Sequence, residues 1–179
     1  MPENNLYLVK DIDGYTPHLS RLVSMMNYAR DVTYYSVKNL TTYQLDHLVF
    51  KEGNTIGALL MHIAAVDHFY HIFTFENREP TEDEFEFWMP ALDLGKTGRE
   101  KIKGNDIKFY LELLNSTRQK TLERFKTVND EWLHEEMPFW NNEPANRYFM
   151  WFHVFEDEIN HRGQINLLKK QIPAEQPLK

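Results

Sequence analysis

The chain has 179 residues, of which 42% are hydrophobic and 14% aromatic, and its formal net charge is −7 at pH 7. A single domain over residues 1–179 with a sizeable core is the simplest organisation for this length. The acidic balance argues against a nucleic-acid partner, which rewards clustered Lys and Arg. The sequence contains no Cys, which excludes disulfides, thiolate metal sites and cysteine nucleophiles.

The sequence also lacks targeting and membrane signals. The start, "MPENNLYLVKDIDGY", has no basic region followed by an apolar one, as a secretory signal would. No apolar run approaches the roughly 18 residues that a membrane helix needs. We therefore expect a cytoplasmic protein with no membrane partner.

Four long helices are predicted in chain order. The first covers residues 17–38, where Thr16 suits the N-cap and Pro17 the first helical position. After a brief turn or helix in "TTYQLDHL", the second covers residues 55–76. The third and fourth cover residues 105–128 and 145–171, and are joined by a short link through Pro138 and Pro144. Each has apolar residues at helical spacing.

The long connection over residues 77–104 is rich in Pro and Gly and contains the acidic run "TEDEFEF". We interpret the run as a solvated loop, and the connection as a crossover or lid because tight turns are much shorter. Four amphipathic helices with no competing β pattern predict an all-α, antiparallel four-helix bundle. The length of the connection permits up-down-down-up order.

His62 lies at the centre of the apolar face of the second helix, whereas Asp67, His68 and His71 fall on the side expected to face solvent. A buried imidazole needs partners for both nitrogens. Taken alone, His62 is more simply a core histidine bonded to a carbonyl or a carboxylate than a metal ligand.

The fourth helix changes this assessment, because "WFHVFEDEINHRGQ" places His153, Asp157 and His161 at four-residue steps. Such residues are neighbours on a helix, but His153 and His161 are about 12 Å apart along the axis. The plausible metal-binding trios are therefore His62 with Asp157 and His161, or His62 with His153 and Asp157. Two histidines and one carboxylate form a recurrent site for divalent metals. The competing interpretation is an Asp–His pair in a solvated groove.

Arg30 and Arg118 fall on the apolar faces of the first and third helices. A buried guanidinium needs a carboxylate, so we favour structural ion pairs, with Glu158 or Asp46 as partners. The alternative is an anion clamp for a carboxylate-bearing substrate or thiol cofactor, which makes both arginines candidate cofactor-binding residues.

Two further groups lie on the fourth helix. Glu156 and Glu158 flank Asp157 and could accept a hydrogen bond from a ligating imidazole. An additional apolar stripe lies on a different side of this helix from the polar residues and consists of Phe152, Phe155 and Ile159. A helix that is apolar on two sides is either central or at an interface, so the stripe indicates a dimer.

"ALLMHIAAVDH" and "WFHVFEDEINHRGQI" together resemble the DinB-like superfamily of bacterial four-helix bundles. The most specific piece is "HRGQ", from His161 to Gln164, and the resemblance extends over most of the chain. It implies an up-down-down-up bundle, often a homodimer, with a histidine triad that binds a divalent metal. His62 matches the first ligand and His161 the last. Asp157 stands where the family often has His.

The resemblance also implies that the protein is a metal-dependent enzyme that acts on a small-molecule substrate. Nickel or zinc are the leading metals, with iron or manganese as alternatives favoured by the harder Asp157. Some relatives transfer groups with low-molecular-weight thiols such as bacillithiol or mycothiol, and others are loosely called metal-dependent hydrolases. The competing hypothesis is a non-catalytic bundle whose metal site has decayed through Asp157. Pairing of Asp157 with an arginine would favour that hypothesis.

Overall fold

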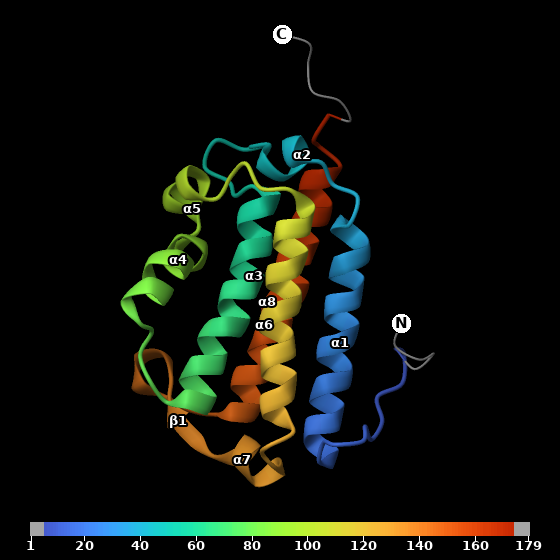
Figure 1. Ribbon diagram of the computed structural model, residues 1–179, viewed down its shortest axis with the longest axis vertical. Helices are drawn as coiled ribbons and strands as arrows, with labels where there is room; N and C mark the ends of the chain where they lie inside the picture. Colours follow the sequence, from blue (N-terminus) through green and yellow to red (C-terminus); the bar gives the residue numbers. More distant parts are fainter. Residues whose placement is uncertain (1–5, 174–179) are drawn as a thin grey trace.

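The computed structural model describes residues 6–173, and its core is a bundle of four long helices. These are α1 (Pro17–Val37), α3 (Ile56–His71), α6 (Ile107–Phe125) and α8 (Arg147–Lys169). In Figure 1, α1 and α8 run upward and α3 and α6 run downward, so the order is up-down-down-up. The predicted all-α bundle is confirmed, with helix ends within a few residues of the predicted ones.

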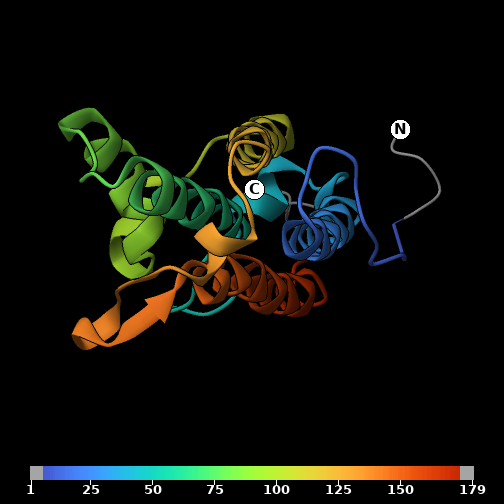
Figure 2. The same ribbon diagram turned by 90° about the horizontal axis from the view of Figure 1, so that it is seen from below.

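Shorter elements connect the long helices at both ends of the bundle. They are α2 (Thr42–Asp46), the π-helical η1 (Ile72–Glu76), α4 (Glu82–Asp93), α5 (Gly95–Lys101), α7 (Asp130–His134), β1 (Glu136–Pro138), the 3-10 turn η2 (Trp140–Asn142) and β2 (Pro144–Asn146). Seen from below in Figure 2, α4 and α5 lie outside α3, and the β1–β2 hairpin extends outward beside α8.

The long helices begin where a side chain can satisfy free backbone N–H groups. Thr55, Asp106 and Asn146 each accept a hydrogen bond from the backbone N–H three residues further on. Such N-caps typically contribute about 1 kcal/mol each. They fix the start of α3, α6 and α8, and thereby the axial positions of the residues on those helices.

The interpretation of the acidic run as a solvated loop was wrong. Thr81 and Glu84 form a reciprocal capping box that starts α4, in which the Thr81 side chain accepts from Glu84 N and Glu84 accepts from Thr81 N. This two-sided capping stabilises helix starts. Residues 77–104 therefore carry two helices, and α4 packs against α3.

The link between α6 and α8 also holds structure that the sequence pattern did not reveal. β1 and β2 pair antiparallel, with Met137 opposite Ala145. Asn141 and Asn142 both adopt positive φ at the turn, a conformation that Asn tolerates better than most residues. Strands of three residues are too short for an alternating pattern to be recognised.

Among the described residues, one segment is long and apolar enough to cross a membrane by composition alone. It is Ile56–Glu76, and 78% of its most apolar window is buried inside the bundle. Burial of that extent is what a core helix shows.

A buried charge cluster ties the four long helices together; it consists of Arg30, Asp67, Arg118 and Glu158. Arg30 Nε lies 3.0 Å from Glu158 Oε1, and Arg118 Nη2 lies 3.1 Å from Glu158 Oε2. Arg118 Nε donates to Asp67 Oδ2 at 2.7 Å. In α1, α6 and α8 the charged residue falls between two apolar clusters, one near each end of the bundle. The cluster therefore divides the core into two apolar halves.

The charge cluster corrects two sequence expectations. The sequence pattern predicts Asp67 on the solvent side of its helix, but this residue is fully buried. Asp46, one of the suggested arginine partners, instead accepts a hydrogen bond from Gly104 N. Glu158, the other suggested partner, is confirmed.

Two helical glycines are expected to respond to alanine with opposite signs. A Cβ on Gly57 would lie 2.6 Å from the hydroxyl of the fully buried Tyr110, so Gly57→Ala should lower the free energy of unfolding by about 1–3 kcal/mol. A Cβ on Gly163 would meet nothing within 4 Å, so Gly163→Ala should raise it by about 0.5–1 kcal/mol. Urea denaturation measures both. A stabilised Gly57→Ala variant would contradict the close approach.

Candidate metal centre

Three of the predicted ligands meet between α3 and α8. His62 Nε2 lies 3.5 Å from Asp157 Oδ2, and His161 Nε2 lies 3.3 Å from Asp157 Oδ1. The two imidazole rings are 4.6 Å apart at an interplanar angle of 74°. Each of the three residues offers a ligand atom within 4.8 Å of the others. Antiparallel packing of α3 on α8 thus brings together residues almost 100 positions apart.

The orientation of His62 is set by α4. His62 Nδ1 lies 2.8 Å from the carbonyl oxygen of Ala91. A carbonyl can only accept, so Nδ1 carries the proton and, in the neutral imidazole, Nε2 carries a lone pair. That lone pair faces Asp157. A carbonyl that fixes the tautomer of an imidazole in this way is a common feature around metal-ligating histidines.

The geometry fits a divalent cation better than it fits a hydrogen bond. When His62 is in its neutral form, its Nε2 and the Asp157 carboxylate are two acceptors that face each other at 3.5 Å, an arrangement that a cation between them would make favourable. Ligand atoms 2.0–2.1 Å from one tetrahedral ion stand about 3.3 Å apart. The observed separations of 3.3 and 3.5 Å, which end on different oxygens of Asp157, are close to this value, and one ligand atom from each residue lies within 4.8 Å of the others.

Unsatisfied buried atoms point the same way. Asp157 Oδ2 and His161 Nδ1 are buried and have no hydrogen-bond partner. Burial alone would raise the pKa of Asp157, but its contacts with the His161 and His62 side chains outweigh burial and hold that pKa far below its ordinary value. Asp157 is therefore ionised at neutral pH, which is the state a metal ligand requires.

His153 stands outside this group. Its Nδ1 lies 3.1 Å from Glu156 Oε2, and its ring packs edge-on against Trp140 of the hairpin. Of the two trios considered from the sequence, the structure brings together His62, Asp157 and His161. His153 lies one helical turn before Asp157, at the edge of the centre.

Neither arginine contacts the centre. Arg30 and Arg118 direct their N–H groups to the buried charge cluster and to the carbonyls of Leu114 and Met26. These are the structural ion pairs that the sequence analysis favoured. The contacts do not support the alternative, in which the two arginines bind an anionic substrate or cofactor. Glu158 likewise bonds to the arginines rather than to a ligating histidine.

Sequence reasoning missed two contributors. The Ala91 carbonyl could not be found, because a backbone acceptor leaves no signature in residue type. Tyr70 is 6% exposed and its ring lies 6.0 Å from that of His153. Burial, followed by the charge of Asp157, raises the pKa of Tyr70, so its hydroxyl stays protonated as a donor. Its position two turns from His62 on the same helix was an available signal.

Comparison with known proteins agrees with this geometry. A family model described as mycothiol S-transferase matches residues 21–174. The chain belongs to the mycothiol S-transferase family. This family lies within the DinB-like superfamily, which confirms the resemblance, and membership supports a metal-dependent enzyme of the thiol-transferase type.

A solved structure, that of a conserved protein from Enterococcus faecalis, is also similar. It aligns with a TM-score of 0.68 over 84% of this chain and 94% of that chain, at 14% identity. At this identity the likeness shows the fold alone. No curated protein matches the chain.

Proposed function

We propose that the protein is a metal-dependent S-transferase that joins a low-molecular-weight thiol to a small electrophilic molecule. The observation that carries the proposal is the lone pair of His62 Nε2, fixed by Ala91, facing ionised Asp157 beside His161. Membership of the mycothiol S-transferase family makes mycothiol the first thiol to test and bacillithiol the second.

His62, Asp157 and His161 would hold a divalent ion, with nickel or zinc proposed first and iron or manganese as alternatives. Such an ion lowers the pKa of a thiol that it binds. In the transfer, the thiol loses its proton, a C–S bond forms at the electrophilic carbon, and a leaving group departs with the bonding electrons. If the acceptor is a double bond, its other carbon takes up a proton instead.

The residues beside the centre have assignable roles in this reaction. His153 is partly exposed, and Glu156 orients its ring through Nδ1. Its other nitrogen, Nε2, would accept the proton that the thiol loses. Tyr70, with its protonated hydroxyl, would donate a hydrogen bond to substrate.

Two other functions are less well supported. Pairing of Asp157 with Arg30 or Arg118 would favour the decayed-site hypothesis, whereas those arginines pair with Asp67 and Glu158. A hydrolase would use the same centre to activate water, but the family match favours thiol chemistry.

We also propose a cytoplasmic homodimer. Phe152 and Ile159 of the predicted stripe are 45% and 40% exposed on α8, while Phe155 turns inward and is buried. Phe149, at 46%, extends the exposed apolar surface instead. Light scattering would give the molar mass in solution.

The test of the proposed function has two stages. Elemental mass spectrometry of protein prepared without a histidine tag should find about one divalent ion per chain. The loaded protein should then accelerate the reaction of mycothiol with monobromobimane, an electrophile that becomes fluorescent when its bromide is displaced.

A matched pair of variants controls both stages. His161→Ala should lose the ion and the acceleration, whereas His134→Ala removes an exposed histidine that contacts His18 and Tyr148 and should retain both. Failure to take up nickel, zinc, iron or manganese would contradict the metal centre. Uptake without acceleration for either thiol would contradict the transferase.

A further inference from the structure

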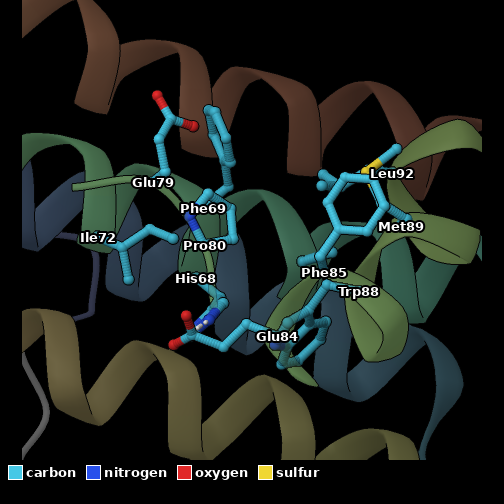
Figure 3. A pocket seen from close by; sticks show the side chains of 11 residues that line it. His68, Phe69, Ile72, Glu79, Pro80, Glu84, Phe85, Trp88, Met89 and Leu92 are labelled. Carbon is cyan, nitrogen blue, oxygen red and sulfur yellow. Dashed lines mark ion pairs between the residues drawn. The ribbon is translucent and has the colours of Figure 1, made fainter. Parts of the chain in front are cut away.

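A cavity separate from the metal centre, which we call the α3–α4 pocket, lies between the outer face of α3 and helix α4 (Figure 3). Its volume is about 160 Å³. It is lined by Ala65, His68, Phe69, Ile72, Glu79, Pro80, Glu84, Phe85, Trp88, Met89 and Leu92. None of these residues belongs to the metal centre.

The walls of the α3–α4 pocket are mainly apolar. Phe69 and Ile72 come from α3 and the turn that continues it, and Met89 and Leu92 face them from α4 (Figure 3). An apolar protein cavity of about 150 Å³ stays dry and binds benzene. The α3–α4 pocket has a similar volume and a mainly apolar lining, although it is partly open to solvent, and it can hold a single aromatic ring.

One edge of the pocket is polar and incompletely satisfied. His68 Nε2 is buried, has no hydrogen-bond partner, and lies 3.5 Å from Glu84 Oε1. The His68 ring is held by stacking on Trp88, with centroids 5.0 Å apart and an interplanar angle of 26°. Burial lowers the pKa of His68, which keeps the imidazole neutral at neutral pH.

Glu84 is in contrast a fixed anion. Arg78 donates to both of its carboxylate oxygens at 2.6 and 2.9 Å, and the backbone N–H of Thr81 donates at 2.8 Å. These bonds, that of Arg78 first, lower the pKa of Glu84 to about 2. Glu84 Oε1 can accept a further hydrogen bond at the pocket edge, while neutral His68 can donate one or accept one.

We propose that the α3–α4 pocket binds a small monocyclic aromatic molecule with one hydroxyl group. The ring occupies the apolar volume, and the hydroxyl donates to Glu84 Oε1 and accepts from His68 Nε2–H. This gives His68 Nε2 the hydrogen-bond partner that the described protein residues do not supply. The proposal goes beyond the proposed transferase function, since it uses none of the metal ligands.

The pocket is nevertheless connected to the metal centre through α4. Met89 and Leu92 line the pocket, and Ala91 between them bonds to His62 Nδ1. Ala65, which lines the pocket, is three residues from His62 on α3, a rise of about 4.5 Å. A ligand that holds α4 in place also holds the carbonyl that orients His62.

Fluorine NMR titration of the full chain tests the proposal with two probes, 4-fluorophenol and fluorobenzene. Saturable one-site binding of 4-fluorophenol is expected. Met89→Trp fills the pocket from a partly exposed position and should weaken binding at least tenfold. Tyr35→Trp changes an exposed residue on α1, outside the pocket, and should leave the affinity within twofold. Circular dichroism confirms that each variant is folded.

His68→Phe tests the polar edge. It removes the hydrogen bond but keeps a flat ring beside Trp88. Loss of one hydrogen bond should weaken 4-fluorophenol about fivefold and leave fluorobenzene within twofold. Absence of saturable binding, or equal affinity in wild type and Met89→Trp, would overturn the pocket. Equal weakening of both probes by His68→Phe would overturn the role of the hydroxyl.

Discussion

Replacing Arg118 with methionine is expected to lower the free energy of unfolding by about 3–5 kcal/mol, a loss typical of breaking a buried ion pair on one side. Arg118 is 4% exposed and bonds to two fully buried carboxylates, Asp67 and Glu158. Methionine keeps much of the volume but leaves Asp67 with only the 3.5 Å contact to Arg30 and the hydroxyl of Thr121. Guanidinium chloride denaturation at pH 7 measures the difference.

The matched control is Arg21→Met, which removes an exposed ion pair with Asp11 and should change stability by less than about 1 kcal/mol. Burial opposes ionisation of Asp67 and Glu158, but their arginine partners lower both pKa values below the ordinary 3.8 and 4.5. Their contribution is therefore present above those values and lost as pH falls. The gap between the free energies of unfolding of wild type and Arg118→Met should narrow as pH falls below about 4. Equal losses in the two variants would refute a structural role for the buried charge cluster.

Replacing Asp157 with asparagine is expected to weaken binding of a divalent ion by about 100-fold or more, because changes even outside the direct ligands cost 10–100-fold. The amide would retain the shape of the side chain but lose the negative charge that faces His62 and His161. Competition of zinc with a chromophoric chelator gives the affinity of each protein.

The control for this variant is Glu156→Gln, which removes the neighbouring carboxylate on the same helix and should leave zinc affinity nearly unchanged. Asp157→His introduces the residue that DinB-like relatives often carry, and should retain a metal site. Zinc binding by Asp157→Asn with wild-type affinity would mean that the carboxylate is no ligand.

Much of the bundle could be predicted from helical periodicity, because four long amphipathic segments bury most of the apolar residues. The metal trio could also be predicted. The spacing of Asp157 and His161 places them on one face of the fourth helix, and His62 is a polar residue on the apolar face of the second predicted helix. The sequence could not decide whether His153 or His161 completes the trio, because that depends on the axial position of α3 relative to α8. That position depends on tertiary packing and on N-caps such as Thr55 and Asn146.

The errors have physical explanations. A single helix can bury residues on several sides, so the wheel of α3 could not show that Asp67 faces Arg118 on α6. Helix α4 was hidden by its acidic composition, although Thr81 and Glu84 have the spacing of a capping box. The pocket beneath α4 could not be predicted, since cavities depend on how side chains pack rather than on their pattern in sequence.

The charges of Arg30, Asp67, Arg118 and Glu158 sum to zero, and each comes from a different long helix. Loss of any one member leaves an uncompensated charge in the interior, so single substitutions are penalised, while the exchange of a whole set for apolar residues can be neutral. During divergence these four positions should therefore change together. Relatives that share this core are expected to show correlated substitutions at these four positions, rather than the same residue at any one position.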